Sequence, residues 1–173
     1  MKRFASILLA LAAALPAAPA YAADSLGREL QPFAFLAGSC WRATLPGGQM
    51  TDTHCFTPML GGRFLRDRHQ ISGATYAGET IYRWDAEVGR IRWHYYASDG
   101  MLMSGTAAGV DNGVAFEVVE VSPRSASPVP MRVAWRRDGA DGYVVTSEVR
   151  DGESWRAAPS TPRFQRIGPA PAD

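Results

Sequence analysis

Residues 38–56 read GSCWRATLPGGQMTDTHCF and hold both cysteines of the chain, placed symmetrically about Gly47 and Gly48. A Gly-Gly pair between two runs rich in β-formers predicts a hairpin with a two-residue turn. In that register the numbers of facing residues add up to 95, so Cys40 faces Cys55. Facing side chains have Cβ atoms about 4.5–5.5 Å apart, close to the range that a disulfide bridges. The stretch therefore predicts a hairpin joined by a Cys40–Cys55 disulfide.

The same register places Trp41 opposite His54. Two buried, reduced thiols are the main alternative to the disulfide. A catalytic or metal-binding role is disfavoured for them, because the neighbouring His54 and Cys55 have no partner at the spacing of a zinc site. We therefore predict no metal and no cofactor.

The N-terminus has the features of a secretory signal peptide. Lys2 and Arg3 are followed by an apolar run over residues 7–15 and by Ala-Tyr-Ala at 20–22, which matches a cleavage site. We predict that residues 1–22 are removed after Ala22 and that the protein is periplasmic or secreted, where paired cysteines oxidise. The apolar run is shorter than the roughly 20 residues of a membrane helix. We therefore predict no membrane anchor.

Charge and length narrow the possible partners and the number of domains. Without Lys2 and Arg3, 16 basic residues face 17 acidic ones. This balance argues against a nucleic-acid or anionic-membrane partner. The remaining length suits one domain, which we place at 23–167, followed by a disordered tail at 168–173.

The pattern after position 47 is typical of an all-β sandwich or barrel: turn signals recur about every 8–12 residues between runs of β-branched and aromatic residues. The connections are mostly of hairpin length, and closure into a barrel removes both free edges of such a meander. We predict an up-and-down barrel of about ten antiparallel strands with one short N-terminal helix over 25–36. The Pro/Ser-rich loop 122–130 is a candidate rim or portal. The expected strands are 39–45, 50–57, 63–72, 75–84, 90–98, 101–109, 114–121, 130–138, 142–150 and 154–167.

The same arithmetic predicts which face of the middle strands looks inward. With turns at 73–74, 86–89 and 99–100, the numbers of facing residues add up to 147, 175 and 199, respectively. The expected pairs include Arg68–Glu79, Thr80–Tyr95, Tyr82–Trp93 and Tyr95–Ser104. Because side chains alternate between the faces of a strand, a largely aromatic face separates from a charged one. The aromatic face is expected to line the lumen.

Small residues such as Gly78 and Gly105 are expected to leave room beside the aromatic side chains. An aromatic wall with a few convergent polar groups is the usual composition of a ligand pocket. Asp67 and His69 lie two residues apart on that face. We expect a charge-assisted hydrogen bond between them, and we expect the pair to bind the polar head of a ligand. The alternative is that the two side chains hydrogen-bond only to each other inside a packed core. The candidate ligand-binding residues are Asp67, His69, Thr80, Tyr82, Trp84, Trp93, Tyr95 and Ser104.

The opening FLAGSCW at 35–41 resembles the start of a lipocalin-like barrel of the calycin superfamily, in which a short helix leads into a first strand marked by glycine and tryptophan. Bacterial exported lipocalin-like proteins of unknown function resemble the chain most, and lipocalins, fatty-acid-binding proteins and nitrobindin are more distant. The resemblance implies that Trp41 closes one barrel end and that Arg166 or Arg163 packs across it.

The chain departs from the lipocalin pattern at two places. Ser39 and Cys40 separate the glycine from the tryptophan, and the C-terminal histidine with which nitrobindin-like proteins ligate haem is missing.

Three functions follow from these features. The leading one is an exported barrel that binds a small, largely apolar or amphipathic molecule. The second is a closed barrel acting as an interaction or structural domain, with an exposed apolar patch near Met59 and Leu60. The third is an enzyme with Asp67 and His69 as an acid–base pair, which ranks last because no nucleophile motif or nucleotide-binding loop accompanies the pair.

Overall fold

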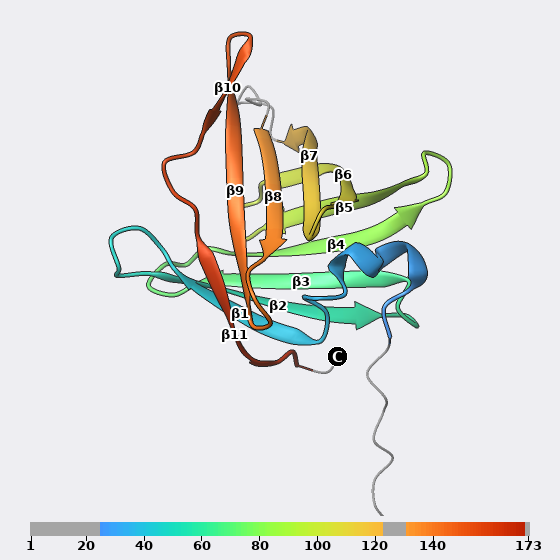
Figure 1. Cartoon of the computed structure of the whole chain (residues 1–173). Helices are drawn as coiled ribbons and strands as arrows, with labels where there is room; N and C mark the ends of the chain where they lie inside the picture. Colours follow the sequence, from blue (N-terminus) through green and yellow to red (C-terminus); the bar gives the residue numbers. More distant parts are fainter. Residues whose placement is uncertain (1–24, 123–130, 172–173) are drawn as a thin grey trace, which may run out of the picture.

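The computed structural model describes residues 25–122 and 131–171, and Figure 1 shows their arrangement. The predicted signal peptide, the loop at 123–130 and residues 172–173 lie outside this part of the chain. Over the described ranges, no helix is long and apolar enough to cross a membrane.

The strands close into a ten-stranded antiparallel meander barrel with one extra strand, as predicted. From β1 to β9 each strand pairs with the next, and the extra strand β10 pairs with β9. Closure comes from β11, which pairs with β1 on one side and β9 on the other. Figure 1 shows β8 and β9 crossing β2–β4 steeply, as the right-handed twist of strands requires. The strands are β1 (Ser39–Thr44), β2 (Thr51–Met59), β3 (Phe64–Ile71), β4 (Ala77–Asp85), β5 (Arg90–Ala97), β6 (Leu102–Val110), β7 (Gly113–Ser122), β8 (Met131–Arg137), β9 (Gly142–Asp151), β10 (Ser154–Ala157) and β11 (Arg163–Pro169).

The last predicted strand, 154–167, is two strands in the structure. Both β10 and β11 pair with β9, and residues 158–162 interrupt them. This interruption contains Pro159 and Pro162, and proline cannot donate a ladder hydrogen bond. β11 also runs to Pro169, so the ordered chain extends past the predicted start of the tail at 168.

Three of the four predicted hairpin registers are confirmed. Cys40 pairs with Cys55, Arg68 with Glu79, and Tyr82 with Trp93. The fourth is wrong by one residue: Tyr95 pairs with Met103, and Ser104 pairs with His94.

The error in the fourth register arises at the β5–β6 turn. The Ala97 N–H donates to the Met101 carbonyl at 2.9 Å, which leaves a three-residue loop with Gly100 at φ 87°. Three-residue hairpin loops place glycine at this left-handed position. Met103 and Gly105 therefore face inward with Trp93, while Ser104 faces outward with His94. A Cβ at position 105 would collide with the Trp93 ring and the Glu117 carbonyl, so that ring fills the expected space.

The predicted N-terminal helix is a 3-10 helix, η1 (Arg28–Phe33). Figure 1 shows it near the barrel end at which β2 finishes. Its Leu30 and Phe33 side chains are buried, and the Phe33 ring packs on Tyr82 and Phe116 with centroids 4.5 and 5.9 Å away. η1 therefore covers one end of the barrel with apolar side chains.

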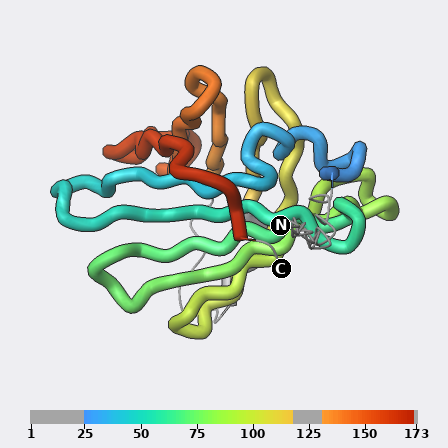
Figure 2. The backbone as a smooth tube through the Cα atoms, turned by 90° about the horizontal axis from the view of Figure 1, so that it is seen from below, coloured from blue at the N-terminus to red at the C-terminus, as the bar shows by residue number. Residues whose placement is uncertain are grey.

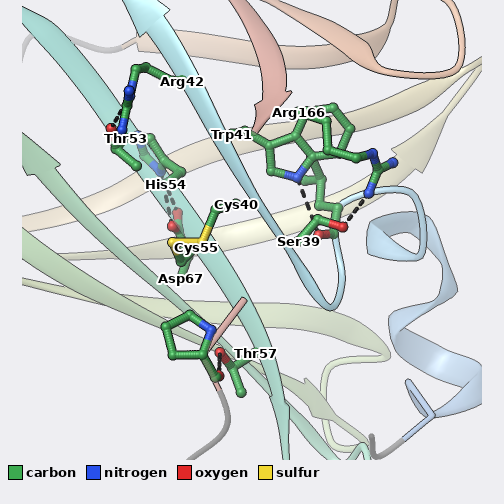
Figure 3. Close-up of a disulfide and its surroundings, with 12 residues drawn as sticks. Ser39, Cys40, Trp41, Arg42, Thr53, His54, Cys55, Thr57, Asp67 and Arg166 are labelled. Carbon is green, nitrogen blue, oxygen red and sulfur yellow. Dashed lines mark hydrogen bonds and ion pairs between the residues drawn. A yellow bond between two sulfur atoms is a disulfide. The ribbon is translucent and has the colours of Figure 1, made fainter. Parts of the chain in front are cut away.

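The predicted disulfide is present between Cys40 and Cys55. Figure 3 shows it between β1 and β2, beside the Asp67–His54 contact. The Arg166 guanidinium lies 4.2 Å from the centroid of the Trp41 ring and donates to the Ser39 hydroxyl. The Trp41 indole N–H donates to the Leu36 carbonyl at 3.3 Å, which ties the first strand to the segment that follows η1.

Candidate functional site

The register of β2 and β3 brings polar side chains together inside the barrel. His54 faces His69 across the strand pair, and Phe56 faces Asp67. Because side chains alternate along a strand, all four point to the same side of the sheet. Phe56 is fully buried, so this side is the lumen.

Asp67 binds His54. The His54 Nδ1 lies 2.9 Å from both oxygens of the Asp67 carboxylate, and Figure 3 shows the two side chains pointing toward each other. The exposed fraction is 3% for the Asp67 side chain and 13% for the His54 side chain. The His54 ring also contacts the Phe164 and Trp135 rings at 5.2 and 6.1 Å between centroids. The lumen therefore holds a hydrogen-bonded carboxylate–imidazole pair among aromatic rings.

Asp52 joins the two histidines. One carboxylate oxygen lies 3.2 Å from His54 Nε2 and the other 3.2 Å from His69 Nδ1. The His54 and His69 rings stack with centroids 4.9 Å apart and an angle of 22° between their planes. The other nitrogen of His69, Nε2, lies 2.9 Å from the Tyr95 hydroxyl, which donates to the Tyr76 hydroxyl at 2.8 Å. We call this series the lumenal chain: Asp67, His54, Asp52, His69, Tyr95 and Tyr76.

The charges of the lumenal chain follow from its burial and its partners. Burial disfavours the charged imidazolium, but the carboxylates of Asp67 and Asp52 outweigh this effect and raise the pKa of His54 to about 10. Burial also favours a protonated Asp52, yet hydrogen bonds from His54 and His69 hold its pKa well below the usual range. Burial, with the neighbouring Tyr76, raises the pKa of Tyr95. At neutral pH a cationic His54 thus lies beside an anionic Asp52.

The lumenal chain reaches the barrel end opposite η1. Asp52 follows the β1–β2 turn, and Tyr76 follows the β3–β4 turn. Figure 2 shows these two turns projecting on the same side of the molecule. Solvent reaches three side chains of this series: the exposed fraction is 15% for Asp52, 13% for His54 and 11% for His69.

Two apolar side chains lie next to the lumenal chain. The Trp135 ring is 6.1 Å from the His54 ring between centroids, and Met103 faces Tyr95 across β5 and β6. Both are partly buried against the core, as are Val133 and Val145. An apolar wall next to convergent polar groups is the composition of a small-molecule pocket.

The predicted site residues divide between this site and the core. Asp67, His69 and Tyr95 belong to the lumenal chain. Tyr82 packs beneath η1, and Thr80 is buried two residues before it on β4. Trp93 donates its indole N–H to the Thr106 carbonyl at 3.1 Å and is buried on Gly105.

Two predicted site residues do not lie in the lumen. Trp84 is 39% exposed at the end of β4, and Ser104 is on the outward face of β6.

The expected Asp67–His69 hydrogen bond is wrong, because Asp67 binds His54 and His69 binds Asp52. Residues two apart on one strand are separated by about 6.5 Å along the chain, whereas residues on adjacent strands approach more closely. The prediction of the site missed Asp52, His54 and Tyr76. The hairpin register already placed His54 opposite Trp41, and extending it two residues would have brought Asp52 to the same face.

A groove of about 880 Å³ lies on the other face of the same strands. Its lining includes Arg42, Thr53, Cys55, Arg68 and Glu79, which are register neighbours from β1 to β4. Most of its lining belongs to the outer surface; His69 also contributes to it, whereas Asp52 and His54 do not.

The raised pKa of His54 makes a prediction about stability and pH. A group whose pKa is about 10 when folded and 6.5 in its ordinary state stabilises the fold fully below the lower value and loses this contribution as the pH rises through the higher one. We therefore expect the free energy of unfolding, measured with urea, to fall between about pH 7 and pH 10. His54→Gln should flatten this decline, and His94→Gln should keep it. An equal decline in wild type and His54→Gln would contradict the assignment.

The fold and the site define a closed antiparallel β-barrel with a partly solvent-accessible polar chain at one end of its lumen. No protein-family model matches the chain, and no curated protein matches it in sequence. The closed meander barrel is consistent with a lipocalin-like fold, and membership of the calycin superfamily stays a prediction.

Proposed function

We propose that this protein is an exported binding protein that takes a small, largely apolar molecule with a polar head into its barrel. The observation that carries the proposal is the lumenal chain. Six polar side chains are linked by hydrogen bonds beside partly buried apolar ones. A purely structural core has no need of a polar chain that solvent still reaches, since each buried polar group costs free energy unless it is satisfied.

A buried hydroxyl supports the same proposal. Tyr143 is fully buried, and its hydroxyl has no hydrogen-bond partner among the described residues. Burial raises the Tyr143 pKa, and the carboxylates of Asp67 and Asp52 raise it further. Natural proteins leave few such groups unpaired, and a ligand that accepts a hydrogen bond would satisfy this one.

Export is part of the proposal and rests on two observations. The N-terminal sequence matches a secretory signal peptide, and the Cys40–Cys55 disulfide is consistent with an oxidising compartment. The proposed ligand therefore belongs to the periplasm or the exterior.

The proposal is tested with 1-aminoanthracene, a fluorescent probe that has an apolar ring system and an amine. We expect its emission to rise and shift to the blue on titration with the protein. Met103→Trp places a bulky ring in the lumen and should weaken probe binding at least about tenfold, which corresponds to ~1.4 kcal/mol.

Leu102→Trp is the matched control. It makes the same kind of change one residue earlier, where the side chain is 46% exposed, so probe affinity should stay at the wild-type value. Urea unfolding of both variants checks that each folds. Equal affinities in wild type and a folded Met103→Trp variant would place the probe outside the lumen and count against the proposal.

A further inference from the structure

We propose that Asp52, His54 and His69 form a binding site for a divalent transition-metal ion of the zinc type. The inference rests on the proposed function, because it names a ligand class for the same lumenal site. The observation behind it is the convergence of two imidazole nitrogens and one carboxylate in a place that solvent reaches.

The separations of these groups suit one ion. One potential ligand atom from each residue lies within 4.8 Å of the others, and Asp52 is 3.2 Å from His54 Nε2 and from His69 Nδ1. Ligand atoms at about 2.0–2.1 Å around a tetrahedral zinc are roughly 3.3 Å from each other. The imidazole rings are stacked at 22°, and one nitrogen of each ring already lies 3.2 Å from the Asp52 carboxylate.

The remaining nitrogen of each histidine already has the partner that a metal-bound histidine needs. The His54 Nδ1 faces the Asp67 carboxylate at 2.9 Å, and the His69 Nε2 faces the Tyr95 hydroxyl at 2.9 Å. Metal-bound histidines typically donate their other N–H to a carboxylate or another acceptor, which fixes the tautomer and orients the ring. Both rings are thus held with the opposite nitrogen toward Asp52.

The hydrogen bond between the two tyrosines fixes the second partner of His69. The Tyr95 hydroxyl donates to Tyr76, so it accepts from an N–H at His69 Nε2. A metal ion bound at Nδ1 would take the place of the proton that His69 shares with Asp52 at 3.2 Å, and binding at His54 Nε2 would likewise release a proton, as metal binding to histidine does.

The donor set selects the type of metal. Two imidazoles and one carboxylate suit zinc, iron, copper or nickel, whereas magnesium and calcium prefer oxygen ligands. The two cysteines are joined in the disulfide and offer no thiolate. Three protein ligands leave at least one coordination position open, where water or the polar head of a lumenal ligand would bind.

The test is isothermal titration calorimetry with zinc chloride on the purified protein after treatment with a chelator. We expect one zinc per chain with a Kd of about 1 μM or tighter. His69→Gln removes a ligand and should weaken zinc binding at least about 100-fold, while Tyr95→Phe removes an orienting hydroxyl and should weaken it about tenfold. Tyr95→Phe keeps the ring, so the test holds even if His69→Gln fails to fold.

His94→Gln is the matched control, because His94 is the third histidine of the chain and faces outward beside Ser104. Its zinc affinity should equal that of the wild type. Absence of zinc binding by the wild type, or equal losses in the His94 and His69 variants, would overturn the metal site.

The zinc and probe titrations distinguish the two proposals. If zinc fails to bind while 1-aminoanthracene binding still depends on Met103, only the metal site is wrong. If zinc binds with the expected dependence on His69 and Tyr95 while the probe does not bind, the metal site stands and the organic ligand is wrong.

Discussion

Replacing His54 with alanine should lower the free energy of unfolding by about 3–5 kcal/mol, because it leaves a buried carboxylate without its partner. The Asp67 side chain is only 3% exposed, and both of its oxygens contact the His54 ring. Water cannot easily replace the lost imidazolium at that depth. Urea unfolding at neutral pH measures the change directly.

The matched control removes both partners. The His54 ring lies among Phe56, Trp135 and Phe164, so His54→Phe combined with Asp67→Leu replaces the pair with apolar side chains of similar volume. Such replacements are often neutral or stabilising, and the double variant should recover most of the loss. A decrease below about 1 kcal/mol in His54→Ala would mean that the pair is solvated like a surface ion pair.

Loss of the Cys40–Cys55 disulfide should cost about 3 kcal/mol, the value expected for a closed loop of this length. The two cysteines are 15 residues apart in the sequence, and the bond limits the freedom of the unfolded hairpin. It also joins β1 to β2, and β1 is a closing strand of the barrel. Urea unfolding of the wild type with and without dithiothreitol gives the difference.

The double variant Cys40→Ala/Cys55→Ala serves as the control for reduction. It should match the reduced wild type and should be insensitive to dithiothreitol. An unfolding midpoint that reduction leaves unchanged in the wild type would show that the bond does not constrain the chain.

The sequence alone predicts the barrel and most of its registers, because hairpin turns and strand alternation are local signals. The Gly47–Gly48 turn places Cys40 opposite Cys55, and the same arithmetic holds through β5. It fails at the Asp99–Gly100 dipeptide, which fits both a two-residue loop and the last two positions of a three-residue loop. The structure uses the longer loop, and a slip of one residue moves every side chain of β6 to the opposite face.

The site was only half predictable, for a different physical reason. Asp67, His69 and Tyr95 share the lumenal face by alternation along adjacent strands, so the pattern finds them. Their partners depend on side-chain directions: Asp67 reaches diagonally to His54, and His69 reaches diagonally to Asp52. Sequence spacing fixes which face a residue occupies, and it does not fix which neighbour a flexible carboxylate contacts.

The lumen that results is divided along its length. Beneath η1 the rings of Phe33, Tyr82 and Phe116 pack together, and this end is apolar. At the other end the lumenal chain keeps contact with solvent. The polar end is therefore the place where we propose that the ligand head, and a metal ion, bind.

Native mass spectrometry of the protein, purified without reducing agent from the cells that make it, tests the proposed binding function most directly. The account predicts a mass in excess of the bare chain that is lost on collisional activation and is absent from Met103→Trp. After this loss the chain should be lighter than its reduced form by about 2 Da, for the two hydrogens removed by the disulfide. If the mass in excess of the bare chain is no larger for the wild type than for a folded Met103→Trp variant, the binding function is contradicted.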